Sequence, residues 1–199
     1  AEMKSSVEAL RQKVTASQDE INRLRSDLER ARDDAILDPM TGILNRRGFE
    51  KRIESLLANK PIDGTSHCLV MLDIDHFKKV NDTHGHLMGD RVIQAVGEIL
   101  RTSVTNGTHA AARYGGEEFA LLLPQTSLDQ AIQLAETVRT RTKAMKIRHR
   151  TTQEVLLTVT ISGGVAEMRH DDDASSLIAR ADAALYQAKT GGRDRVARA

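Results

Sequence analysis

Arg113-Tyr114-Gly115-Gly116-Glu117-Glu118-Phe119 lies between two apolar runs that are typical of β-strands. Adjacent glycines between two strands predict a tight hairpin, because a two-residue primed turn needs positive φ angles that glycine adopts without a steric penalty. In that register Arg113 faces Glu118 across the turn, and Tyr114 faces Glu117 on the other side of the sheet. The sequence therefore predicts two adjacent carboxylates at the tip of a hairpin.

The two acids of this tip need something that offsets their charge. Adjacent carboxylates at a bend disfavour each other unless solvent, an arginine or a metal cation lies nearby. An ion pair with Arg113 is a sufficient explanation for Glu118. Glu117 has no such partner in the predicted register, so it is the stronger candidate for a functional carboxylate.

A further acid, Asp73, ends the apolar run 67–73, which is typical of a buried central strand. A charge in that position is costly unless it is solvated or paired. If this strand neighbours the hairpin, Asp73 and Glu117 converge on one point. Two or three hard oxygen ligands with open positions suit Mg²⁺, which also takes substrate phosphates. The residues thus indicate a metal-dependent site that handles phosphate.

Other ligand-type side chains have simpler explanations. Asp75 precedes a predicted helix, so a role as helix N-cap explains it better than metal binding. His84 and His86 have neither a third histidine nor a cysteine pattern beside them, so they are interpreted as loop residues and not as a zinc site.

The first part of the chain carries a heptad pattern. Apolar or small residues recur at alternating steps of three and four, at Val7, Leu10, Val14, Ser17, Ile21, Leu24, Leu28, Ala31 and Ala35. The stripe is narrow, which favours a parallel coiled-coil dimer over a single helix that packs on its own domain. The pattern stops at Leu37-Asp38-Pro39, because proline ends or redirects a helix. We expect a dimerisation and signalling helix over residues 1–36 and a second domain over 37–199.

The second domain mixes helices and strands. Helices are predicted at 46–59, capped by Asn45, at 76–82 and 89–104, at 128–146, capped by Ser127, and at 174–190, ending at Gly191-Gly192. Strands are predicted at 67–73, 108–114 and 119–123, at 155–162, closed by Gly163-Gly164, and at 195–197. These elements predict an α+β fold, with an antiparallel or mixed sheet and helices largely on one face.

Composition narrows the classes of protein. The hydrophobic content is 40% and only 3% is aromatic, so the core is aliphatic, and a net charge of +1 gives no argument for nucleic-acid binding. The single cysteine, Cys68, excludes an internal disulfide and fits a reducing cytosol. No apolar run approaches the roughly 18 residues that cross a bilayer. We expect a cytoplasmic fragment of a longer protein, whose missing N-terminal region holds an upstream sensor and could tether the protein to a membrane.

The stretch 113–119 resembles the signature of the GGDEF family of diguanylate cyclases, in its Gly-Gly-Glu-Glu-Phe form. Other blocks resemble that family in the same order: residues 38–47, with conservative changes at Met40 and Ile43, 73–78, 81–86 with 89–90, 158–165, and 181–189 with 192–193. The resemblance covers about residues 37–196. Such an ordered set is far more specific than the pentapeptide alone.

The resemblance implies a ferredoxin-like sheet, like the palm of nucleotide cyclases and polymerases, and the condensation of two GTP into cyclic di-GMP and two pyrophosphates. A ribose 3′ hydroxyl attacks the α-phosphate of the opposing GTP in that reaction. By position, Asp73 and Glu117 would hold Mg²⁺ or Mn²⁺ together with the carbonyl of Ile74. Glu118 would be a further metal ligand or the base for the hydroxyl; we prefer assistance on the metal side, because a carboxylate beside Mg²⁺ is a poor base.

The same resemblance implies the residues that bind GTP. Asn81 and Asp90 would read guanine. An ionised carboxylate can accept hydrogen bonds from the N1–H and N2–H groups of guanine, and adenine lacks this edge. The alternative for Asp90 is a role as an acid in the first turn of a helix. The remaining implied substrate-binding residues are Lys78, Lys189 and Arg193, which would bind the phosphates, Gly115 and Gly116, which allow close approach of the nucleotide, and Phe77. For Lys189 and Arg193, compensation of a helix dipole is the alternative.

One departure from the family pattern bears on regulation. Many members carry an inhibitory product site, Arg-x-x-Asp, just upstream of the signature, where this chain has Asn106-Gly107-Thr108-His109. We therefore expect no product feedback through that site. Because each protomer holds one GTP, two must meet, and the heptad helix would keep two catalytic domains at high effective concentration as a homodimer.

Three other readings remain open from the sequence. A non-catalytic nucleotide sensor of this family is disfavoured by the full set of acids, a mixed GMP–AMP product is not excluded, and a purely structural coiled-coil protein leaves the catalytic blocks unexplained.

Overall fold

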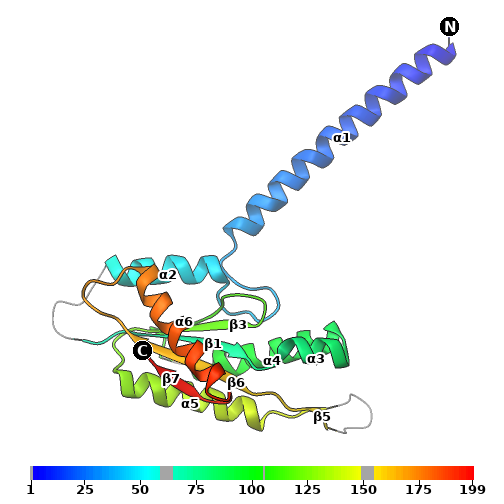
Figure 1. Ribbon diagram of the computed structural model, residues 1–199. Helices are drawn as coiled ribbons and strands as arrows, with labels where there is room; N and C mark the ends of the chain where they lie inside the picture. Colours follow the sequence, from blue (N-terminus) through cyan, green and yellow to red (C-terminus); the bar gives the residue numbers. More distant parts are fainter. Residues whose placement is uncertain (1, 59–64, 105, 149–154) are drawn as a thin grey trace. The chain divides into compact units, whose positions relative to one another are not determined.

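The computed structural model describes residues 2–58, 65–104, 106–148 and 155–199. The chain divides into two compact units, Ala1–Ile36 and Leu37–Ala199. The first unit is formed by a single helix, and the second is an α+β domain (Figure 1).

The first unit is the helix α1 (Glu2–Asp34), which contains neither glycine nor proline. Its apolar stripe is open to solvent in the single chain: Val14 is 63% exposed, Leu24 58% and Leu28 52%. A helix with an uncovered apolar stripe gains stability only by burying that stripe against another surface. Within the described part of the chain, no helix is long and apolar enough to cross a membrane.

The second unit contains a five-stranded mixed sheet. Its strands lie in the order β2 (Ala110–Arg113), β3 (Glu118–Leu123), β1 (Cys68–Ile74), β6 (Ile161–Glu167) and β7 (Val196–Arg198). All neighbours are antiparallel except β6 and β7, which run parallel. A small second sheet pairs β4 (Ile147–Arg148) with β5 (Val155–Leu157). The predicted α+β fold with a mixed sheet is confirmed.

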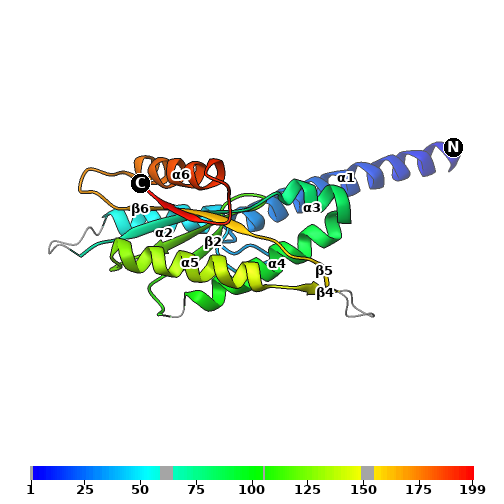
Figure 2. The ribbon, with the colours of Figure 1, turned by 60° about the horizontal axis from the view of Figure 1, so that its bottom comes forward.

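Helices cover both faces of this sheet, so the expectation that they lie largely on one face is wrong. The helices α4 (His86–Ser103) and α5 (Leu128–Ala144) pack on one face, and α2 (Arg46–Ala58) and α6 (Ala174–Thr190) on the other (Figure 2). The reason lies in β1, in which every residue is buried. A strand without a polar side needs cover above and below.

The predicted strand 155–162 is also wrong. The chain is divided there into β5 and β6, and Gly163 and Gly164 lie inside β6 instead of closing a strand. A Cβ on Gly164 would collide with the backbone of α6, at the Ala181 carbonyl and the Leu185 nitrogen. Glycine is needed here because a helix rests directly on the strand backbone.

Several helix boundaries follow from their predicted caps. Asn45 accepts from the Gly48 N–H at 2.9 Å before α2, and Ser127 forms a capping box with Gln130 before α5. The helix α6 has the predicted bounds. The helices α3 (Phe77–His84) and α4 are longer than predicted, and only Gly85, with φ 81°, separates them.

Candidate active site

The β2–β3 hairpin differs from the predicted turn. Arg113 is paired with Phe119, and the Tyr114 and Gly115 N–H groups both donate to the Glu118 carbonyl, at 2.8 and 3.1 Å. Gly115 and Gly116 are not among the described glycines with positive φ. The loop is therefore wider than a two-residue primed turn, and the predicted pairing of Arg113 with Glu118 is wrong.

Arg113 braces the hairpin tip against another loop. Its guanidinium donates to the Gly116 carbonyl at 2.8 Å. It also forms an ion pair with Asp38, whose Oδ2 atom lies 3.3 Å away, and both side chains of this pair are largely buried. Asp38 also accepts from the Thr41 N–H and hydroxyl, at 2.9 and 2.6 Å. Local sequence patterns carry no signal for this brace, because Asp38 and Arg113 are 75 residues apart.

Asp73 forms an ion pair with Lys189 near the hairpin tip. The Lys189 Nζ atom lies 2.7 Å from Asp73 Oδ2, and the Asp73 side chain is 8% exposed. Burial raises the pKa of the Asp73 carboxyl above its usual range, and the hydrogen bond from Lys189 offsets only part of that rise. Burial and then the charge of Asp73 also raise the pKa of Glu117. A further cation beside these two carboxylates would favour their ionised forms.

The oxygen atoms at this place fit a hard divalent cation. Asp73 and Glu117 supply carboxylates, and the Ile74 N–H donates to the Glu117 carbonyl at 3.2 Å. In an extended strand, the carbonyl of a residue points to the same side as its N–H, so the Ile74 oxygen is also directed toward the hairpin. A few protein oxygens that leave positions open for water and phosphate suit Mg²⁺ better than Zn²⁺.

Glu118 lies beside these residues, at the start of β3. It is exposed, it is the cross-strand partner of Asp73, and a Cβ on Gly115 would collide with its Oε2 atom. Across residues 2–58, 65–104, 106–148 and 155–199, no three Asp, Glu, His or Cys side chains form a group that could hold a metal.

The predicted base-reading residues lie where α3 meets α4. The Oδ1 atom of Asn81 is buried and has no hydrogen-bond partner among the described residues. Gly89 packs against it so closely that a Cβ there would collide with this oxygen. Asp90 is half-buried in the second turn of α4, so its explanation as a first-turn helix acid is wrong. An unpartnered buried acceptor is costly and suits a ligand that donates a hydrogen bond.

The predicted phosphate-binding residues are only partly brought together. Lys189 lies in the last turn of α6, whereas Arg193 lies three residues beyond the end of that helix, with φ 61°. Lys78 and Arg193 are exposed. The side chain of Phe77 is buried in the core, which leaves its backbone as the part that can face a ligand.

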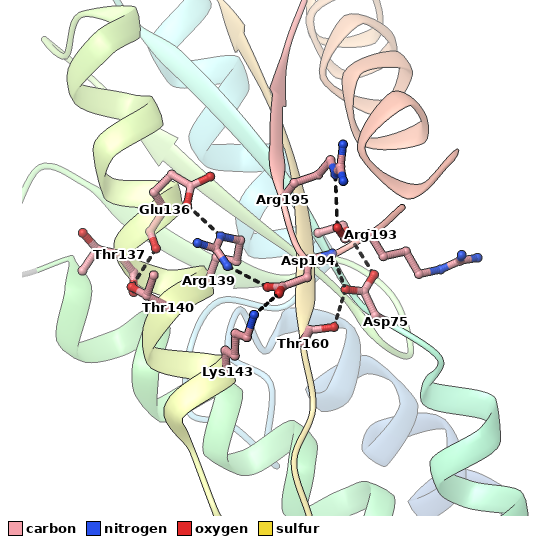
Figure 3. Close-up of polar contacts among 11 residues, drawn as sticks. Asp75, Glu136, Thr137, Arg139, Thr140, Lys143, Thr160, Arg193, Asp194 and Arg195 are labelled. Atoms are coloured by element: carbon pink, nitrogen blue, oxygen red, sulfur yellow. Dashed lines mark hydrogen bonds and ion pairs between the residues drawn. The ribbon is translucent and has the colours of Figure 1, made fainter. Parts of the chain in front are cut away.

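Asp75 does not cap α3 as predicted. The N-cap of that helix is His76, which makes no side-chain capping bond. Asp75 instead accepts from the Ser162 and Thr160 hydroxyls, both at 2.7 Å, and from the Asp194 N–H at 3.0 Å (Figure 3). It joins the end of β1 to β6 and to the loop before β7, contacts that sequence reasoning missed because its partners are at least 85 residues away.

Comparison with known proteins gives one consistent family. Residues 35–195 match the family described as "Diguanylate cyclase, GGDEF domain". The chain is 40% identical over 195 residues to diguanylate cyclase VdcA of Vibrio cholerae, and 37% identical over 195 residues to diguanylate cyclase DgcP of Pseudomonas aeruginosa. Each alignment covers 98% of this chain, but the chain spans only 56% and 28% of these two relatives.

A solved structure extends the likeness to both units of the chain. The coiled coil and GGDEF domain of DgcB from Caulobacter crescentus, in complex with c-di-GMP, is 38% identical, with a TM-score of 0.79. The match covers 96% of this chain and 99% of that one.

Proposed function

The chain belongs to the GGDEF family of diguanylate cyclases, and we propose that it condenses two GTP molecules into cyclic di-GMP with release of two pyrophosphates. The observation that carries the proposal is the meeting of Asp73, Glu117 and Lys189 beside the glycine hairpin. Because the matched relatives are longer proteins, the activity of the whole protein belongs to this proposal.

A divalent cation, Mg²⁺ or Mn²⁺, would be held by Asp73, Glu117 and the Ile74 carbonyl. When bound, it would offset phosphate charge and favour ionisation of the attacking hydroxyl. Lys189 neutralises Asp73 in the chain alone and lies at the end of α6, from where its flexible side chain can turn to a phosphate. Glu118, which has no ion pair with Arg113, would assist on the metal side of the reaction.

The protein would bind GTP at both ends of the nucleotide, the guanine base and the phosphates. Asn81 Oδ1, a buried acceptor without a partner, and the Asp90 carboxylate would take the N–H donors of guanine. Lys78, Lys189 and Arg193 would contact the phosphates. The 3′ oxygen of one GTP then forms a bond to the α-phosphorus of the other, the bond to pyrophosphate breaks, and the hydroxyl proton passes to a carboxylate or water.

Two active sites must face each other, so we propose a homodimer joined through α1. The exposed apolar stripe of α1 supports this, as does the coiled coil in the DgcB structure. Removal of residues 2–35 should lower specific activity sharply in dilute solution, and fusion of the second unit to an unrelated parallel coiled coil should restore it. Equal specific activity of the truncated and full chains across a dilution series would refute this role.

Product feedback through the usual site is proposed to be absent. Asn106 uses its Oδ1 atom to accept from the Thr108 and His109 N–H groups, at 3.3 and 2.9 Å, and the His109 Nε2 atom lies 2.9 Å from Thr126 Oγ1. The Asn106 side chain thus bonds within its own loop, and His109 contacts the residue before the N-cap of α5. Turnover should stay constant as cyclic di-GMP is added, and strong non-competitive inhibition would contradict the proposal.

Product analysis after incubation with GTP and Mg²⁺ tests the function. We expect cyclic di-GMP from the unmodified chain and loss of it in Asp73→Asn and Glu118→Gln. Glu98→Gln is a matched control, because it is an equally conservative change in an exposed ion pair of α4. A mixed dinucleotide in the presence of ATP would change the proposed specificity, and nucleotide binding without any product would indicate a sensor instead.

A further inference from the structure

The loop that joins α6 to β7 has an unusual backbone. Gly192, Arg193 and Asp194 have φ angles of 117°, 61° and 45° in succession. Glycine adopts such angles freely and aspartate tolerates them, but arginine seldom does. Two adjacent non-glycine residues in the left-handed region persist only where surrounding contacts hold them.

The side chain of Asp194 supplies one set of these contacts. Its Oδ1 atom lies 2.7 Å from Arg139 Nη1, and its Oδ2 atom lies 2.6 Å from Lys143 Nζ (Figure 3). Arg139 and Lys143 are one turn apart on α5, so they reach the same carboxylate from one helix face. Arg139 is itself fixed by Glu136 at 2.7 Å and is 18% exposed, so the loop is tied to a helix on the opposite side of the sheet from α6.

The backbone of the loop supplies the second set. The Asp194 N–H donates to Asp75 Oδ2 at 3.0 Å, and the Arg193 N–H donates to the Ala188 carbonyl at 3.0 Å. Asp75 stands two residues after Asp73 and is 4% exposed. The loop is therefore attached both to the end of α6 and to the strand that carries the candidate metal ligand.

Arg193 is held by its backbone while its charge stays available. Among the described residues, its guanidinium has no ion-pair partner, and Figure 3 shows it directed away from Asp194 and α5. The cations on α5 bind Asp194 instead, which leaves the neighbouring arginine without an intramolecular anion. Such an arrangement fixes the backbone position from which the arginine side chain extends, which reduces the ordering that a bound anion must impose.

We propose that Asp194, anchored by Arg139 and Lys143, is a positioning residue that fixes Arg193 for contact with the outer phosphates of GTP. This role rests on the proposed function. Asp194 does not touch the substrate; it acts through the backbone of the loop. Its effect should therefore appear in the binding of a nucleoside triphosphate and not in the reading of the base.

The test compares equilibrium binding of GMP and of a GTP analogue with a methylene bridge between its α- and β-phosphates. Asp194→Ala should weaken the analogue about tenfold and raise the KM for GTP similarly, with less change in kcat, because a small misplacement of a binding group has effects of this order. GMP affinity should stay within about twofold. Asp194→Asn, which tolerates the same backbone angles but loses the charge, should give an intermediate effect.

A double variant separates positioning from a general loss of structure. If Asp194 acts through Arg193, the Asp194→Ala/Arg193→Ala variant should bind the analogue no more weakly than Arg193→Ala alone. Additive losses, or an equal loss of GMP affinity, would overturn the role. Unchanged analogue binding in Asp194→Ala, with the unmodified chain still making cyclic di-GMP, would overturn it and leave the proposed function standing. Failure of the unmodified chain to bind the analogue would overturn both.

Discussion

Lys189 neutralises Asp73: the Nζ atom of the lysine lies 2.7 Å from Oδ2 of the carboxylate. A lysine and a metal ion would therefore compete for the same oxygen. We expect Lys189→Gln to tighten Mn²⁺ binding in the absence of nucleotide by about tenfold, since that factor corresponds to about 1.4 kcal/mol of lost competition. The same variant should weaken GTP binding.

Titration of Mn²⁺ by electron paramagnetic resonance measures this effect. Lys78→Gln is the matched control, because Lys78 is exposed and is not paired with Asp73 in the described structure. Equal Mn²⁺ affinity in Lys189→Gln and the unmodified chain would mean that the ion pair does not compete with the metal.

Gly164 and Gly163 should respond differently to the same substitution. A Cβ on Gly164 meets the backbone of α6, which cannot move alone, whereas a Cβ on Gly163 meets chiefly the flexible end of Leu72, at 3.0 Å. Gly164→Ala should therefore lower the free energy of unfolding by about 1–3 kcal/mol or more, and Gly163→Ala by less. Urea denaturation of both variants measures the difference, and equal losses would show that α6 can shift without cost.

The stability contributed by Asp172 should depend on pH. Burial opposes ionisation of this side chain, but the Arg169 N–H, the Ser176 hydroxyl and the Arg180 guanidinium outweigh it and hold the pKa of Asp172 below its usual range. A lowered pKa gives stability that is present above the pKa of the unfolded chain, about 3.9, and is lost as the pH falls through the lower folded value.

Asp172→Asn should accordingly lower the free energy of unfolding at pH 7 by about 1–2 kcal/mol. The difference from the unmodified chain should shrink in acid as the native carboxylate is protonated. Asp173→Asn is the control, because asparagine caps a helix about as well as aspartate. A difference for Asp172→Asn that stays constant between pH 7 and about pH 2.5 would contradict the prediction.

Cys68 should be unreactive in the folded chain. Its side chain is buried, its thiol lies 3.3 Å from the Thr126 carbonyl, and burial raises the pKa of the thiol to about 12. On the order of one thiol in ten thousand is ionised at pH 8, so reaction with a disulfide reagent should wait for unfolding. Full labelling within seconds without denaturant, at the rate seen in guanidinium chloride, would disprove this.

Sequence patterns predicted the parts of this fold that depend on near neighbours. The caps Asn45 and Ser127 and the bounds of α6 follow from contacts within a few residues, and the buried β1 follows from an unbroken apolar run. The convergence of Asp73 and Glu117 was predicted only on the condition that β1 neighbours the hairpin, and β1 does pair with β3. The roles of those acids stay proposals.

The features of the fold and the site that could not be predicted from the sequence depend on contacts between residues far apart in the chain. Gly163 and Gly164 have the sequence of a turn, and only the packing of α6 on Gly164 shows why that position has no side chain. Asp75 has the form of an N-cap, but its oxygen atoms bind groups as far as 119 residues away. The hairpin register differs from the predicted one, and Arg113 binds Asp38 and the Gly116 carbonyl instead of Glu118.

The lack of a side chain at Gly164 also bears on the distance between Lys189 and Asp73 in the candidate active site. Leu185, which rests on that glycine, stands one helical turn before Lys189. Gly164 is paired with Met71, two residues before Asp73 in β1. The positions of Lys189 and Asp73 therefore both depend on the close contact between α6 and the backbone of Gly164.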